Sequence, residues 1–158
     1  MKVETFLRVD GEFLSMSKCH EAVRDENYIE GAIEITIQQK EILSREHWDY
    51  VDQLWSYLLN GISEISEGHS FSTYLPDQPV EISFKVLDIN KVEVQVNDNK
   101  TTTALVVQRD IFLKVMLEAC RDFFQQLLVV APGTKDLCKL ALLQIEEIQK
   151  CIQQERTN

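Results

Sequence analysis

The segment from residue 67 to residue 80 gathers the side chains best suited to chemistry. Within nine positions it holds an imidazole, two serine hydroxyls, a phenol and a carboxylate: His69, Ser70, Ser72, Tyr74 and Asp77. These types can supply a nucleophile, a base that activates it and a group that orients the base. A single short loop rarely folds its own triad, because the members usually come from separate elements. Capping and turn formation are the commoner uses of such residues, so we predict no catalytic residue here.

We expect this segment to be a stiff, irregular loop that recognises another molecule. Pro76 and Pro79 restrict its backbone where the chain leaves it. Loops of this length in a small domain are usually functional or disordered, and the aromatic residues argue against disorder. Aromatic side chains are also enriched at the centres of protein interfaces. The binding residues predicted from the sequence are His69, Phe71, Tyr74, Asp77 and Gln78.

The other reactive residues do not form a recognisable site. Cys19 and His20 are adjacent, so they point apart on a helix or a strand. His47 has no second histidine at the spacing that a helical metal site needs. The chain contains no C-x-x-C pair and no glycine-rich phosphate motif, so we predict neither a metal nor a cofactor. We expect the four cysteines to be structural thiols. Three of them lie in apolar helical patterns, where a free cysteine behaves as a small buried apolar residue: Cys120, Cys138 and Cys151.

The charge of the chain narrows the class of partner. The 158 residues carry a formal net charge of -10, and the acidic excess includes residues 1 to 34. An acidic field repels phosphate backbones, so we predict no nucleic-acid partner, and it accelerates encounter with a basic protein. No stretch approaches the roughly 20 apolar residues of a membrane span. The first residues lack an apolar secretory core, so we expect no membrane association and a cytoplasmic location.

Hydrophobic periodicity predicts the elements. Asp10-Gly11 favours a type I′ turn in a hairpin over residues 3 to 16. Apolar residues alternate with polar ones near residues 33 to 37 and in three further strands over residues 80 to 107. An apolar seam that includes Trp48 and Trp55 predicts a helix over 45 to 66, with Ser44 as its N-cap and an early end at Gly61 as an alternative. Two more helices are expected over 110 to 130 and 135 to 154.

These elements predict an α+β fold: an antiparallel sheet of five or six strands, one long helix on a face of the sheet and a C-terminal αα-hairpin. The chain length fits a single domain over residues 1 to 155, with a frayed tail at 156 to 158.

Three functional hypotheses are compatible with this pattern. The first is a non-enzymatic protein-binding domain, in concrete form an acidic inhibitor or bacterial immunity-type protein that neutralises a basic partner. The second is an enzyme or small-ligand-binding domain that uses a cleft between the long helix, residues 67 to 80 and the sheet, with His69, Tyr74 and Asp77 facing the pocket. Separately, Trp48 and Trp55 could line an apolar ligand pocket between helix and sheet. The third is an oligomerisation module, in which Leu142 and Leu143 of the last helix supply a homodimer surface.

Overall fold

Nine strands form two antiparallel sheets in the computed structural model, which describes residues 1–158. The first sheet has the order β2-β1-β3-β4, with β5 also paired to β3. The second sheet has the order β6-β7-β8-β9. The strands of the first sheet are β1 (Lys2–Val9), β2 (Glu12–Ser15), β3 (Glu30–Ile37), β4 (Lys40–Leu43) and β5 (Asp49–Tyr50). Those of the second are β6 (Phe71–Tyr74), β7 (Glu81–Asp88), β8 (Lys91–Asn97) and β9 (Thr102–Gln108).

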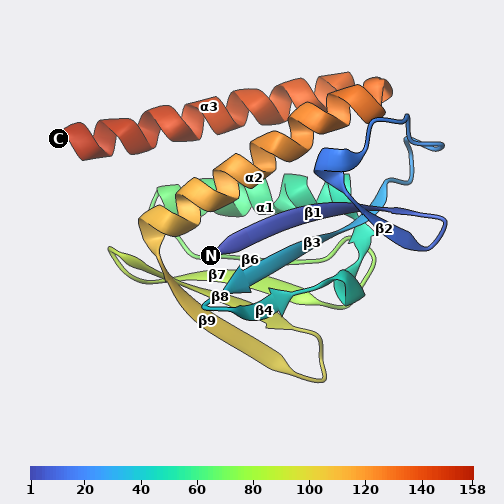
Figure 1. Cartoon of the computed structure of the whole chain (residues 1–158). Coiled ribbons are helices and arrows are strands. Elements are labelled where there is room, and N and C mark those ends of the chain that lie inside the picture. The colour runs from blue at the N-terminus through green and yellow to red at the C-terminus, as the bar shows by residue number, and fades with distance from the viewer.

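Three α-helices cover one side of the strands: α1 (Val51–Ser66), α2 (Arg109–Val130) and α3 (Lys135–Thr157). Helices α1 and α2 contact strands of both sheets, and α3 lies outermost across α1 and α2 (Figure 1). The sheets meet where β4 lies against β8 and β9. Short 3-10 helices are present at Met16–Lys18, Arg45–His47 and Pro132–Thr134. The predicted α+β class and C-terminal αα-hairpin are confirmed, with the strands divided between two sheets.

The core lies between the helices and the two sheets. Its largest fully buried side chains include Trp55 of α1, Phe84 of β7, and Phe112 and Phe123 of α2. The Phe84 and Phe112 rings meet edge to face, with centroids 4.8 Å apart. The indole nitrogen of Trp55 donates a hydrogen bond to the Thr5 hydroxyl at 3.0 Å, so its one polar atom is satisfied inside the core.

The first hairpin and the second sheet follow the sequence closely. Asp10 and Gly11 both have positive φ, at 52° and 81°, as a type I′ turn requires. Strands β7 to β9 form the predicted meander. Helix α3 continues to Thr157, beyond the predicted end. Cys151 is exposed, unlike the other three cysteines, so the expectation of a buried thiol there is wrong.

The start of the long helix differs from the prediction. Helix α1 begins at Val51, because Asp49 and Tyr50 form strand β5 opposite Gly31 and Glu30 of β3. Ser44 instead caps the short 3-10 helix at residues 45–47, through a reciprocal capping box.

Trp48 therefore lies outside α1, on the opposite side of the first sheet. The Arg8 guanidinium stacks over its ring at 3.9 Å. Trp48 and Trp55 thus do not share an apolar seam.

The C-terminal end of α1 is closed by a local motif and by a distant residue. The Gly68 amide donates to the Ile65 carbonyl at 3.1 Å and the His69 amide to the Glu64 carbonyl at 2.8 Å, with Gly68 at a φ of 84°. Helix α1 does not stop at Gly61 and continues to Ser66. The guanidinium of Arg109 donates hydrogen bonds to the Ile65 carbonyl at 3.2 Å and to the Ser66 carbonyl at 2.7 Å. A cation at the C-terminus of a helix also complements the helix dipole. No helix of the protein has the length and apolar character that a membrane span requires.

Candidate functional site

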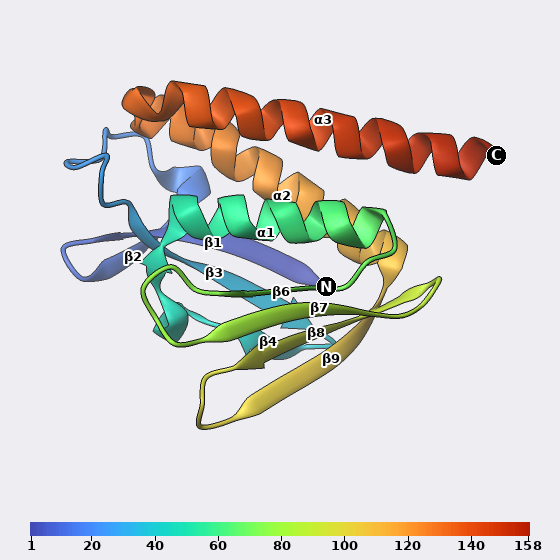
Figure 2. The same cartoon turned by 180° about the vertical axis from the view of Figure 1, so that it is seen from behind.

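The segment from 67 to 80 contains a strand, so the expectation of an irregular loop throughout is wrong. Residues Phe71 to Tyr74 form β6, which pairs with β7 in the register Phe71–Phe84 to Tyr74–Glu81. Phe71 and Thr73 are half-buried, while Ser72 and Tyr74 are exposed. Phe71, Thr73 and Tyr74 are of types that are enriched in strands, which is the weak signal for β6 in the sequence. Strand β6 lies at the edge of its sheet, between β7 and α1 (Figure 2).

Phe71 fixes β6 against α1. A Cβ atom added at Gly61 would lie 2.5 Å from Cδ1 of the Phe71 ring, so only glycine permits this close approach. On the other side, the Phe71 ring packs on Phe84 with centroids 6.0 Å apart. Phe71 is therefore an anchor of the strand and presents only part of its ring to solvent.

The turn from 75 to 80 is held by hydrogen bonds to two separate segments, at residues 48–49 and at Asn99. The buried carboxylate of Asp49 accepts from the main-chain amide of Asp77, at 2.9 and 3.2 Å. The Gln78 side-chain amide donates to the Trp48 carbonyl. Asn99 donates its side-chain amide to the Pro79 carbonyl at 2.9 Å. These contacts give the turn one fixed conformation, and they employ the Gln78 side chain in positioning the turn.

The residues that resembled a triad each have a different partner. The imidazole Nδ1 of His69 lies 3.3 Å from the Glu64 carboxylate, on the protein surface. The Ser70 hydroxyl accepts from the Val86 amide at 2.9 Å, and the Ser72 hydroxyl donates to the Glu81 carboxylate. No serine hydroxyl is hydrogen-bonded to His69, so the segment holds no nucleophile and base in catalytic contact.

Acidic residues dominate the part of the chain that contains α1, β6 and the turn. From residue 46 to residue 84 there is no Lys or Arg, and there are seven carboxylates: Glu46, Asp49, Asp52, Glu64, Glu67, Asp77 and Glu81. Glu64, Glu67 and Asp77 are exposed, as are the aromatic rings of Tyr57 and Tyr74. We call the surface formed by these five residues, Ser72 and Glu81 the acidic edge surface. The lack of Lys and Arg from 46 to 84 is visible in the sequence, but we predicted a local acidic excess only for residues 1 to 34.

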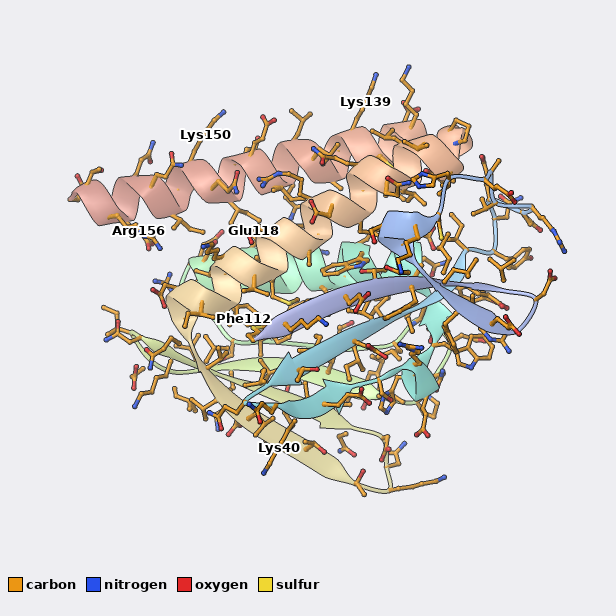
Figure 3. The ribbon with its side chains drawn as sticks, viewed as in Figure 1. Lys40, Phe112, Glu118, Lys139, Lys150 and Arg156 are labelled. Atoms are coloured by element: carbon orange, nitrogen blue, oxygen red, sulfur yellow. The ribbon has the colours of Figure 1, made fainter.

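The C-terminal helix is different, because its charges are mixed. Helix α3 carries both Lys139 and Lys150, which project away from the sheets, and the acids Glu146 and Glu147 (Figure 3). Its exposed large apolar residues are Leu137, Leu140 and Leu143, at 37%, 67% and 56% exposure. Leu142, which we expected at the dimer surface, is half-buried against the core.

A hollow that could hold a small ligand lies away from residues 67 to 80. It has a volume of about 550 Å³ and is lined by residues between Leu7 and Glu30, including Cys19, His20 and Arg24. Burial raises the pKa of the Cys19 thiol above its usual value, which disfavours the reactive thiolate. The thiol donates to the Ser15 carbonyl at 3.3 Å. No group of three or more His, Cys, Asp or Glu side chains is placed to hold a metal ion.

Comparisons of the chain with protein-family models, with curated proteins and with solved structures found no match.

Proposed function

We propose that this protein is a non-enzymatic binding domain that engages a basic protein through the acidic edge surface. The observation that carries the proposal is the continuous stretch from 46 to 84, which has seven carboxylates and no Lys or Arg. Complementary charge steers association and suppresses wrong partners. Exposed Tyr57 and Tyr74 supply the amphipathic rings that are common at interface centres.

The rigidity of the turn from 75 to 80 supports the same proposal. Its hydrogen bonds to Asp49, Trp48 and Asn99 fix the backbone before any partner arrives. A surface that is already ordered loses little conformational entropy on binding, which favours affinity. An inhibitor or immunity-type protein that neutralises a basic bacterial partner is the concrete form of this function.

A charge-reversal experiment tests the proposal. Tagged protein is incubated in native lysate at low salt, and the captured proteins are identified by mass spectrometry. We expect a basic partner that is lost from the triple variant E64K/E67K/E81K. The matched control is E118K/E146K/E147K, which makes the same change of net charge at exposed positions of α2 and α3. Capture of no basic protein, or equal loss from both triple variants, would contradict the proposal.

A second candidate function is the binding of a small ligand in the hollow beside residues 7 to 30. Its volume of about 550 Å³ lies within the range of ligand pockets. Its lining combines apolar residues such as Leu14 with four carboxylates and three cations. Arg8 and Arg24 are paired with Glu30 and Asp10, so Lys18 is the cation left for the acid group of an amphipathic ligand. Thermal unfolding in the presence of fatty acids tests this candidate, and an unchanged Tm would remove it.

A further inference from the structure

Helix α3 has an outer face that no other part of the protein covers. It forms the outermost layer of the fold, and in both views no segment of the chain lies beyond it (Figures 1 and 2). Its inner face is buried at Ala141, Ile145 and Ile148. Successive residues of a helix are about 100° apart, so Leu143 lies on the opposite side from Ala141 and Ile145. The Leu143 side chain is accordingly 56% exposed, at the centre of the outer face.

The charges on this outer face have opposite signs at equal distances from Leu143. Lys139 precedes Leu143 by four residues, and Glu147 follows it by four. Asp136 precedes it by seven residues, and Lys150 follows it by seven. All four charged residues are exposed, and positions separated by three, four or seven residues share one face of a helix. Figure 3 shows both lysines projecting outward from α3.

These charges have no ionic partner within the chain. The ion pairs of the protein involve other residues, and the one pair that reaches α3 joins Arg109 to Glu155 near its C-terminal end. The outer face of α3 therefore carries unpaired charges of both signs around an exposed leucine. Such a pattern is complementary to itself when it is read in the opposite direction.

We propose that α3 pairs in antiparallel orientation with α3 of a second copy of the chain, with the two-fold axis beside Leu143. Asp136 then faces Lys150 of the second copy, and Lys139 faces Glu147 of the second copy together with the adjacent Glu146. Each contact occurs twice, as a two-fold interface requires. In a parallel pair every charge would instead face the same charge of the other copy, which is unfavourable.

The size of this face predicts a weak dimer that depends on protein concentration. Leu140 and Leu143 supply the apolar contact near the axis, at 67% and 56% exposure in the single chain. One pair of helix faces buries less than the roughly 1,200 Å² of a standard interface, and complexes of that size are transient. The ion pairs mainly set the orientation, since exposed ion pairs add little affinity. The acidic edge surface contains no residue of α3, so this inference does not depend on the proposed function.

Exchange of charges tests the antiparallel orientation. Sedimentation equilibrium over a range of protein concentrations gives the dimer Kd of each variant. K139E alone, or E146K/E147K alone, should weaken the dimer roughly tenfold, because each change places like charges together at two symmetric positions. The combined variant K139E/E146K/E147K restores opposite charges across the axis and should regain the wild-type Kd. In a parallel dimer the combined variant would regain nothing, because these residues would still face their own copies.

Cross-linking gives a second test that does not depend on charge. A disulfide needs Cα atoms within about 7 Å of each other. In the antiparallel pair the two Leu143 residues are adjacent, whereas the two exposed Cys151 residues lie about 24 Å apart along the axis. On mild oxidation, L143C/C151S should therefore form an intermolecular disulfide at least roughly tenfold faster than the wild-type protein. The matched control is L87C/C151S, which replaces an exposed leucine outside α3 and should cross-link as slowly as the wild type.

Several results would overturn the inference. A wild-type protein that stays monomeric up to about millimolar concentration would do so, and the outer face would then belong to a different partner. An unchanged Kd in K139E, or no recovery in the combined variant, would also contradict the antiparallel pairing. The same holds if Cys151 cross-links as fast as L143C/C151S. Far-UV circular dichroism of each variant at a dilute, monomeric concentration shows that α3 itself is intact.

Discussion

The buried carboxylate of Asp49 accepts a hydrogen bond from the main-chain amide of Asp77, at 2.9 Å to Oδ2 and 3.2 Å to Oδ1. The same carboxylate accepts from the Tyr50 amide at 2.7 Å. Asp49 thus joins the start of α1 to the turn that follows β6. The interaction uses the main chain of Asp77, and leaves its exposed side chain without this structural role.

Asp49→Ala should lower the free energy of unfolding by about 1–3 kcal/mol, because two main-chain donors lose their acceptor. Hydrogen exchange should accelerate at residues 75 to 79. The control is Asp77→Ala, which keeps the amide and should change stability by less than about 0.5 kcal/mol. Urea unfolding measures both variants. Equal effects of the two substitutions would contradict this account of the turn.

Gly61→Ala should destabilise the protein although alanine is the better helix former. The new methyl group would lie 2.5 Å from the Phe71 ring, and overpacking of this kind costs about 1–3 kcal/mol. The gain in helix propensity recovers only about 1 kcal/mol. A double-mutant cycle with Phe71→Leu, followed by urea unfolding, checks the cause. If the smaller side chain does not reduce the cost of Gly61→Ala, then Phe71 is not the source of the strain.

The fall in the free energy of unfolding at acid pH should depend in part on Asp98. The amides of Thr101 and Lys100 donate to its carboxylate at 2.7 and 2.9 Å and hold its pKa below the ordinary value of 3.8. Because the pKa is lower in the folded protein, ionised Asp98 stabilises the fold above pH 3.8. That contribution disappears as the pH falls through the depressed pKa. Asp98→Asn should therefore destabilise the protein near neutral pH and have no effect in strong acid.

Asp52 serves as a control, because its ionisation should change the stability of the fold in the opposite direction to that of Asp98. Burial raises its pKa above 3.8, so its ionisation weakens the fold as the pH rises through that range. Asp52→Asn should then stabilise the protein at neutral pH relative to acid. Denaturant unfolding at a series of pH values measures both differences. Parallel pH profiles for the two variants would contradict the assigned shifts.

The sequence predicted a homodimer through Leu142 and Leu143 of α3. Because Leu142 is half-buried in the structure, we expect the dimer surface to consist of Leu140 and Leu143. Sedimentation equilibrium should show a dimer that the variant L140K/L143K converts to a monomer. The control is L87K/I89K, which introduces the same charges at one exposed apolar residue near the end of β7 and one in the turn that follows it. A strict monomer of the wild-type protein at high concentration would disprove the homodimer.

The elements that the sequence predicted well are those with a strong local pattern. Strands β7 and β8 alternate apolar and polar residues, and Asp10-Gly11 has the sequence of a type I′ turn. The first residues of the predicted helix were wrong, because pairing of Asp49 and Tyr50 with β3 overrides helical periodicity. Strand β6 was missed, because its four residues show their pattern only when aligned with β7.

The candidate site was predictable only in part. His69, Phe71, Tyr74, Asp77 and Gln78 all lie in or beside β6 and the turn, but the sequence did not give their separate environments. The lack of Lys and Arg between 46 and 84 was legible in the sequence. The place of β6 between β7 and α1 was not, because it depends on contacts between residues distant in the sequence.

The contact between Arg109 and the end of α1 has a consequence for the order in which the chain assembles. Ser66 and Arg109 are 43 residues apart. During synthesis, the Gly68 and His69 amides can close α1 as soon as the helix has left the ribosome, and the whole second sheet is made before Arg109 appears. Helix α1 therefore gains its second set of C-terminal contacts, those from Arg109, only when β6 to β9 have been synthesised.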